Sequence, residues 1–205
     1  MIVNMKTKMM KIKMTICTLC LGFIALISYS NPSGISLSGN DSVKHKDSLE
    51  VMDYTFKDLL DNDVHISDFK GKVVLIDLWY SGCGACIKSN QAINSIHKQL
   101  IGENIVFLSI SVDKNKLKWM QSLTKNAAKS ELNPWAGKYY SSPGTVTLYC
   151  GETGSNNDFV KLYNPENAYP SLLLIDTNGK LVSKDPPRPE IDREKLIRLI
   201  KALLK

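Results

Sequence analysis

The sequence predicts an α/β fold in which a central mixed β-sheet lies between two layers of helices. Apolar runs of strand length occur at 73–79 and 105–112, as expected of strands that are buried on both faces. Segments with apolar residues at helical spacing follow these runs, at 86–100 and 117–123. Such an alternation of strands and helices is typical of a three-layer sandwich.

The C-terminal part of the chain predicts a third strand, a hairpin and a last helix. Residues 171–175 are apolar and long enough for a buried strand. Asp176-Thr-Asn-Gly179 is a typical hairpin turn, and it leads into a short strand at 180–183. Apolar residues between 191 and 203 recur at helical spacing, which predicts a helix with one buried face.

The chain is expected to consist of a leader, a linker and one folded domain. Residues 1–30 join a basic start to an apolar run and small residues, as in a secretory signal peptide, or in an N-terminal anchor if the leader is not cleaved. Residues 31–48 are polar and lack an apolar period, which predicts a flexible linker. Residues 49–205 form the domain. Within it, 124–168 is expected to be an insertion, with a candidate strand at 145–149.

Composition and charge indicate a globular protein without a nucleic-acid partner. Hydrophobic residues make up 43% of the chain and charged residues 22%, values that exclude a largely disordered chain or a membrane bundle. The net charge of +6 owes much to four lysines before residue 14. Without residues 1–30 the balance is 22 basic against 20 acidic residues, so no basic stripe remains for phosphate contacts. We expect a monomer that touches a membrane only if the leader stays uncleaved.

Cys83 and Cys86 lie between the first buried strand and the helix that follows it. A thiol at a helix N-terminus is stabilised as thiolate by unpaired backbone N–H groups and by the helix dipole. The spacing of three residues places both sulfurs on one helix face, close enough for a disulfide. We therefore expect Cys83 to attack a substrate disulfide and the more buried Cys86 to resolve the mixed disulfide.

A Cys-x-x-Cys pair also occurs in zinc sites, in haem attachment sites and as a structural disulfide. Ile87 follows the pair where haem attachment requires histidine. A zinc site needs a second pair of ligands, and the domain at 49–205 offers only the single candidates Cys150, His65 and His97. A disulfide across so short a ring constrains the unfolded chain little. The redox interpretation is therefore preferred. Cys150 is expected to be a partly buried structural thiol, and the alternatives are a third redox partner and an intermolecular link.

The stretch 71–86 resembles the active-site strand and loop of the thioredoxin superfamily. Three further stretches, at 66–71, 108–113 and 169–179, resemble its exported TlpA/ResA branch, which is related to the AhpC/TSA proteins. The resemblance extends over 49–205 and is weak across the insertion. It implies a thioredoxin-like fold and a thiol-disulfide oxidoreductase of a bacterial cell envelope, of the Bacteroidetes type.

The resemblance also implies roles for four residues near the pair. Pro170 matches the family's cis-proline, which would press against the cysteines and leave the backbone of Tyr169 free to pair with a substrate peptide. Asp77 matches the buried acid that accepts and returns the proton of the resolving cysteine. Trp79 packs beside the loop and is a candidate substrate contact. The alternatives are a plain strand-entry proline, an aspartate hydrogen-bonded to backbone at a strand edge, and an ordinary core aromatic.

The motif departs from the family at three positions. Gly82 stands where tryptophan is common before the first cysteine, and Gly84 and Ala85 fill the motif without its usual proline. Because residues between the cysteines tune the reduction potential, the sequence leaves the direction of electron flow open.

Two other functions are considered beside disulfide exchange. A thiol peroxidase of the AhpC/TSA type requires proline and threonine ahead of its cysteine, and residues 79–82 contain neither. A non-catalytic binding or metallochaperone module would be favoured by a Cys-x-x-x-Cys spacing and a downstream metal-binding histidine, which are also missing. The expected partners are disulfide-bearing client proteins and a membrane or envelope electron donor, with no cofactor beyond the cysteine pair.

Overall fold

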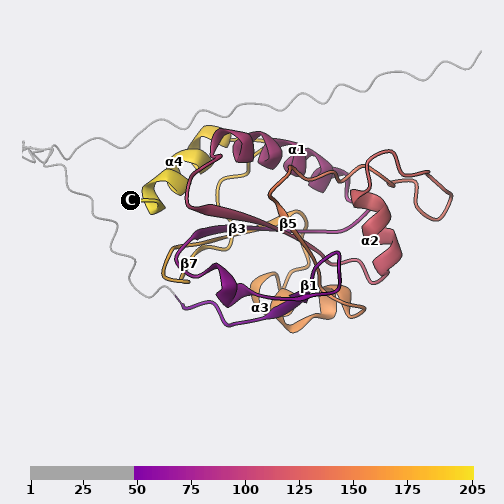
Figure 1. Cartoon of the computed structure of the whole chain (residues 1–205), viewed down its shortest axis with the longest axis horizontal. Coiled ribbons are helices and arrows are strands. Elements are labelled where there is room, and N and C mark those ends of the chain that lie inside the picture. Colours follow the sequence, from indigo (N-terminus) through magenta and orange to yellow (C-terminus); the bar gives the residue numbers. More distant parts are fainter. Residues whose placement is uncertain (1–48) are drawn as a thin grey trace, which may run out of the picture. The chain divides into compact units, whose positions relative to one another are not determined.

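A mixed β-sheet of seven strands forms the centre of a computed structural model that describes residues 49–205 (Figure 1). The strands are β1 (Thr55–Lys57), β2 (Asp63–His65), β3 (Val73–Trp79), β4 (Ile105–Ser111), β5 (Val146–Tyr149), β6 (Ser171–Ile175) and β7 (Leu181–Ser183). Their order across the sheet is β2-β1-β5-β4-β3-β6-β7. β3, β4 and β5 run parallel, whereas β6, β7, β1 and β2 join in antiparallel pairs. The predicted mixed sheet is confirmed.

Helices cover both faces of this sheet, as the predicted three-layer sandwich requires. The helices are α1 (Gly84–Gln99), α2 (Lys116–Leu123), α3 (Asp158–Tyr163) and α4 (Arg193–Leu203), with short 3-10 turns at Ile66–Phe69 and Gly154–Asn156. Figure 1 shows α1 and α4 on one face of the sheet and α3 on the other. The helical stripes predicted at 86–100, 117–123 and 191–203 correspond to α1, α2 and α4.

Strand β3 is buried along its whole length and divides the core into two sides. Val73 and Leu75 pack with buried side chains of α1 and α4. Val74 and Ile76 point the other way and pack with α3. Because side chains alternate along a strand, Asp77 falls on the side of Val73 and Leu75. This alternation thus places the Asp77 carboxyl group on the face of the sheet that α1 and α4 cover.

The segment 124–168, predicted as an insertion, divides into two parts. Residues 124–145 contain no helix or strand. β5, by contrast, belongs to the sheet, where it pairs with β4 and β1. α3 buries Phe159 and Val160 in the core. The candidate strand at 145–149 corresponds to β5, whereas α3 was not predicted, because its six residues are too few to show a hydrophobic period.

The hairpin predicted before the last helix is present. The side chain of Asp176 accepts hydrogen bonds from the backbone N–H groups of Asn178 and Lys180, both at 2.9 Å. Gly179 completes the turn with φ +80°, a backbone conformation that glycine adopts without strain. β1 and its pairing with β2 were not predicted, because β1 has three residues and only Phe56 of them is buried.

The predicted leader 1–30 and linker 31–48 lie outside the described residues. Between residues 49 and 205, none of the helices has the length and the apolar character needed to cross a bilayer. The assignment of the leader therefore stays a prediction from the sequence.

Candidate functional site

Three strand ends meet at one edge of the sheet and bring distant parts of the chain together. The parallel pairing of β3 and β4 places Trp79 opposite Ser111. β6 runs antiparallel to β3, so Leu78 lies opposite Ser171 at the beginning of β6. The loop after β3, the loop after β4 and the residues before β6 consequently gather at the same edge.

Cys83 and Cys86 form a disulfide at this edge, with Cα atoms 5.2 Å apart. After β3 the chain turns, and the backbone N–H of Cys83 donates to the carbonyl of Tyr80 at 3.2 Å. Cys83 then caps α1, with its Sγ accepting from the backbone N–H of Cys86 at 3.1 Å. Cys83 is 6% exposed, whereas Cys86 is completely buried. Cys83 is therefore the outer sulfur of the pair, as the spacing predicted.

Asp113, in the loop after β4, holds the loop that leads to Cys83. Its carboxylate accepts from the backbone N–H of Ser81 at 2.9 Å and from the Ser81 hydroxyl at 2.6 Å. The Ser111 hydroxyl donates to the same carboxylate at 2.8 Å. All three residues are buried. A buried carboxylate with three donors is well satisfied, so this contact fixes the loop two residues before the outer cysteine.

Asp77 is buried in the middle of the sheet, 4% exposed. Burial raises the pKa of its carboxyl group to about 7, because the charged form loses its hydration there, while a hydrogen bond from Tyr139 opposes the shift. The Tyr139 hydroxyl donates to Oδ2, and Oδ1 is buried without a partner. The carboxyl is therefore neither at a strand edge nor bonded to backbone, which contradicts that alternative.

Tyr139 was not singled out by the sequence. It lies in the segment 124–145, and its ring stacks on the Trp79 indole with centroids 3.4 Å apart and planes 3° from parallel. Trp79 also donates from Nε1 to the Ser109 hydroxyl at 2.9 Å. Because Trp79 is completely buried, its proposed contact with a substrate is contradicted. Its packing beside the loop is confirmed, since it lies in one apolar cluster with both cysteines.

The peptide bond between Tyr169 and Pro170 is cis, as the resemblance implies. Pro170 is buried, and Tyr169 packs against the cluster that contains the cysteines. The rings of Tyr169 and Tyr80 meet edge to face, with centroids 5.5 Å apart. The residues before β6 and the loop after β3 thus share an aromatic contact beside the disulfide.

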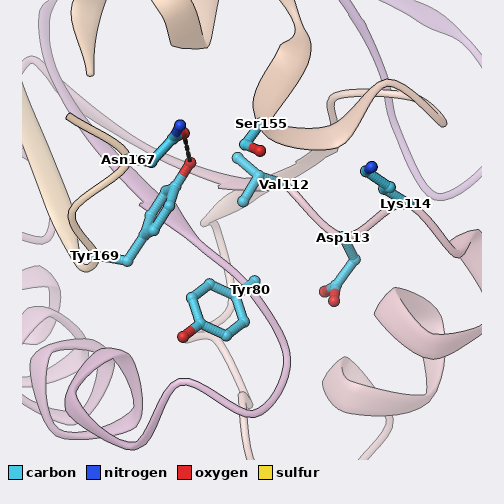
Figure 2. Close-up of a pocket in the computed structure, with 7 residues that line it drawn as sticks. All are labelled: Tyr80, Val112, Asp113, Lys114, Ser155, Asn167 and Tyr169. Carbon is cyan, nitrogen blue, oxygen red and sulfur yellow. Dashed lines mark hydrogen bonds between the residues drawn. The ribbon is translucent and has the colours of Figure 1, made fainter. Parts of the chain in front are cut away.

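A hollow of about 350 Å³ opens next to this aromatic pair. Figure 2 shows the rings of Tyr80 and Tyr169 on one side of it and Lys114 on the other. Val112 and Asp113 also contribute to its lining. Most of its lining is polar, and the apolar part comes from Val112 and the two tyrosine rings.

The single candidate ligands named from the sequence lie on different elements. His65 ends β2, His97 lies on α1, and Cys150 follows β5. Cys150 is a buried free thiol. Burial, and secondarily the charge of Asp113, raises its pKa to about 12, so it is protonated at neutral pH and a poor nucleophile. Among residues 49–205, no group of three or more His, Cys, Asp and Glu side chains is arranged to hold a metal ion.

Comparison with known proteins identifies relatives of this chain. Residues 48–184 match the AhpC/TSA family. A crystal structure of a candidate thiol-disulfide oxidoreductase from Bacteroides vulgatus is 29% identical, with TM-score 0.59 over 75% of this chain and 94% of that one. A solution structure of another from the same organism is 27% identical, with TM-score 0.56 over 81% and 93%.

A more distant solved structure agrees in fold. It is described as a candidate thiol:disulfide interchange protein, DsbE, from Chlorobium tepidum, and is 21% identical, with TM-score 0.58 over 78% of this chain and 99% of that one. At this identity the likeness concerns the fold alone. With the sheet order and helix layers above, it confirms the predicted thioredoxin-like fold.

Proposed function

Because the chain belongs to the AhpC/TSA family, we propose that it is an exported thiol-disulfide oxidoreductase whose redox centre is Cys83 and Cys86. One observation carries the proposal. A Cys-x-x-Cys disulfide caps α1 with one sulfur near the surface and the other buried. That asymmetry suits a pair in which one thiol meets the substrate and the other completes the exchange.

The exchange takes place in two steps. In the reduced protein the Cys83 thiolate attacks one sulfur of a client disulfide, and the other client sulfur leaves as a thiolate. The Cys86 thiolate then attacks the Cys83 sulfur and releases the client's second thiolate. Two electrons pass from the protein to the client, and the two thiol protons end on the client's sulfurs. An electron donor of the membrane or envelope returns the protein to its dithiol form.

Asp77 is the proposed proton acceptor for the buried cysteine. Cys86 must lose its proton before it can attack, and it is shielded from solvent. A carboxyl group with a pKa of about 7 accepts and returns a proton readily at neutral pH. Its position on β3, on the side of the sheet that faces α1, supports this role.

The proposed clients are disulfide-bearing proteins of the bacterial cell envelope. The basic and apolar leader at 1–30 supports export. A client in extended conformation would pair with the backbone of Tyr169 and meet the hollow between Tyr80 and Lys114 with a neighbouring side chain. No cofactor besides the cysteine pair is needed for this reaction.

Trapping of the mixed disulfide tests the proposal. Replacing Cys86 with serine removes the resolving thiol, so client proteins should remain attached to Cys83 when the variant is exported in cells. Non-reducing electrophoresis and mass spectrometry of the adducts would identify the clients. A variant with both Cys83→Ser and Cys86→Ser is the matched control and should trap nothing. Adding Cys150→Ser to Cys86→Ser should leave the adducts unchanged, because Cys150 is buried.

The purified wild-type protein distinguishes this function from thiol peroxidase activity. We expect it to reduce insulin with dithiothreitol as donor, and to consume no hydrogen peroxide above the rate of the double serine variant. Absence of trapped clients together with absence of insulin reduction would rule out the proposed function. Consumption of peroxide that depends on Cys83 would favour the peroxidase alternative.

A further inference from the structure

The indole of Trp135 covers the residue that precedes the outer cysteine. A Cβ atom built on Gly82 would lie 3.2 Å from Nε1 and 3.3 Å from Cδ1 of this indole. Gly82 has φ +99°, so glycine suits both the backbone and the space left beneath the ring. An aromatic side chain from 124–145 therefore lies within one residue of Cys83.

The backbone that follows Trp135 is anchored to α2. Gly137 donates from its backbone N–H to the carbonyl of Gln121 at 2.8 Å, and Tyr139 donates to Ser122 at 3.0 Å. Ala136, next to the tryptophan, is 3% exposed. Tyr139 is buried and hydrogen-bonded to the acid on β3. These contacts fix the backbone that carries the indole before any client arrives, which lowers the entropy lost on binding.

Trp135 nevertheless keeps surface available for a partner, since it is 37% exposed. A client sulfur bonded to Cys83 brings the residues beside the client cysteine to the same part of the surface. Tryptophan is prominent among the residues that contribute most to protein contacts, because its large rigid ring covers much apolar area. An exposed, anchored indole next to a reacting sulfur fits an apolar client side chain.

We propose that Trp135 is a specificity-determining residue that contacts the client polypeptide beside its disulfide and favours clients with an apolar or aromatic side chain next to the attacked cysteine. The inference rests on the proposed function. It adds a substrate preference that the cysteine pair alone does not supply.

Two disulfide-linked peptide dimers, one with phenylalanine and one with serine beside the cysteine, test this preference. Pre-reduced wild-type protein should reduce the phenylalanine peptide about tenfold faster, in kcat/KM, than the serine peptide. Trp135→Ala should lose most of that preference, and Trp135→Phe should keep part of it. The rate with hydroxyethyl disulfide, which has no side chain to contact, and the reduction potential should both stay unchanged.

Leu132→Ala is the matched control, since Leu132 lies in the same segment and is 90% exposed. It should keep the full preference for the phenylalanine peptide. An equal loss on all three disulfides in Trp135→Ala, or a shifted potential, would show that the indole only shapes the loop and would overturn the inference. Wild-type protein that reduces all three without preference would do the same. A wild-type protein that reduces none would overturn the proposed function, and the role of Trp135 with it.

Discussion

Asp77 combines a high cost of burial with incomplete hydrogen bonding. The carboxyl lies between two sheet strands, accepts from Tyr139 on one oxygen and has no partner for the other. The ionised carboxylate is shielded from water there and has no cation in direct contact to compensate for the lost hydration. For this reason the pKa of Asp77 rises. The group proposed to transfer a proton near pH 7 thus weakens the folded state when it is charged.

Replacing Asp77 with asparagine should therefore stabilise the protein at alkaline pH. The pKa is 3.8 in the unfolded chain and about 7 in the folded protein, so only the folded state keeps this proton between those values. Wild-type stability consequently falls as the pH rises from about 4 to about 7. At pH 8 we expect Asp77→Asn to have a free energy of unfolding greater by on the order of 2–4 kcal/mol. The gain should shrink towards pH 4, as measured by urea denaturation at both pH values.

Asp63→Asn serves as the control for this measurement. Asp63 has a side chain 58% exposed and forms a surface ion pair with Lys57. Its loss should change stability by less than about 1 kcal/mol at either pH. Equal stability changes at pH 4 and pH 8 in Asp77→Asn would contradict the burial of an ionisable carboxyl.

Site residues close to the motif could be predicted from the sequence, and those far from it could not. The cysteines are identified by their spacing, and Asp77 by being the one acid in an apolar run. Tyr139 is 62 residues away from Asp77, and no local pattern connects them. No local pattern connects Trp135 with Gly82 either, although the indole lies against this glycine. The contacts that an irregular segment makes with the site can be identified only when the three-dimensional path of the chain is known.

At the scale of elements, the position of the loop that leads to Cys83 depends on the end of β4 as well as on β3 and α1. The Asp113 carboxylate accepts hydrogen bonds from both the backbone N–H and the hydroxyl of Ser81. The Ser111 hydroxyl adds a third hydrogen bond. Because β3 and β4 are parallel neighbours, their loops leave the sheet side by side, and one carboxylate can connect them.

Removal of the Asp113 carboxylate should lower the free energy of unfolding more than removal of the Ser81 hydroxyl that donates to it. Asp113→Ala leaves a buried N–H and two hydroxyls without their acceptor, and we expect a loss of about 2–3 kcal/mol in the free energy of unfolding. Ser81→Ala keeps the backbone N–H bond and the Ser111 bond, and should lose about 1 kcal/mol. Urea denaturation of the oxidised proteins measures both values. If Asp113→Ala were as stable as Ser81→Ala, the carboxylate would not be the element that holds the loop.

The elements predicted from a period are the long ones, whereas the short strand β7 was predicted from the hairpin turn before it. β3 and β4 have seven residues each, and α1 has sixteen. β1 has three residues, and it is stabilised by pairing with β2 and β5, which a local pattern does not reveal. The segment 124–145 has no regular structure at all, so its place beside the cysteines follows from single contacts such as that of Tyr139 with Asp77.

At the scale of the whole described domain, most of the apolar core and the Cys83–Cys86 disulfide lie in different clusters of side chains. One cluster joins the sheet to α3, and a second joins it to α1 and α4. The cysteines belong to a third, smaller cluster at the edge where the strand ends meet. A layered fold can keep a reactive loop on its rim because the layers themselves supply most of the buried apolar area.

Phe159 provides a test of this separation. It is completely buried in the α3 cluster, where its ring meets Tyr54 at 5.0 Å and Phe56 at 5.2 Å between centroids. Phe159→Ala removes these contacts and leaves a cavity, so we expect a loss of about 3–5 kcal/mol in the free energy of unfolding. The rate of insulin reduction at a temperature where the variant stays folded should remain within about twofold of wild type, because the cluster of Phe159 contains neither Cys83 nor Cys86. A large fall in rate with little change in stability would show that the α3 face is coupled to the redox site.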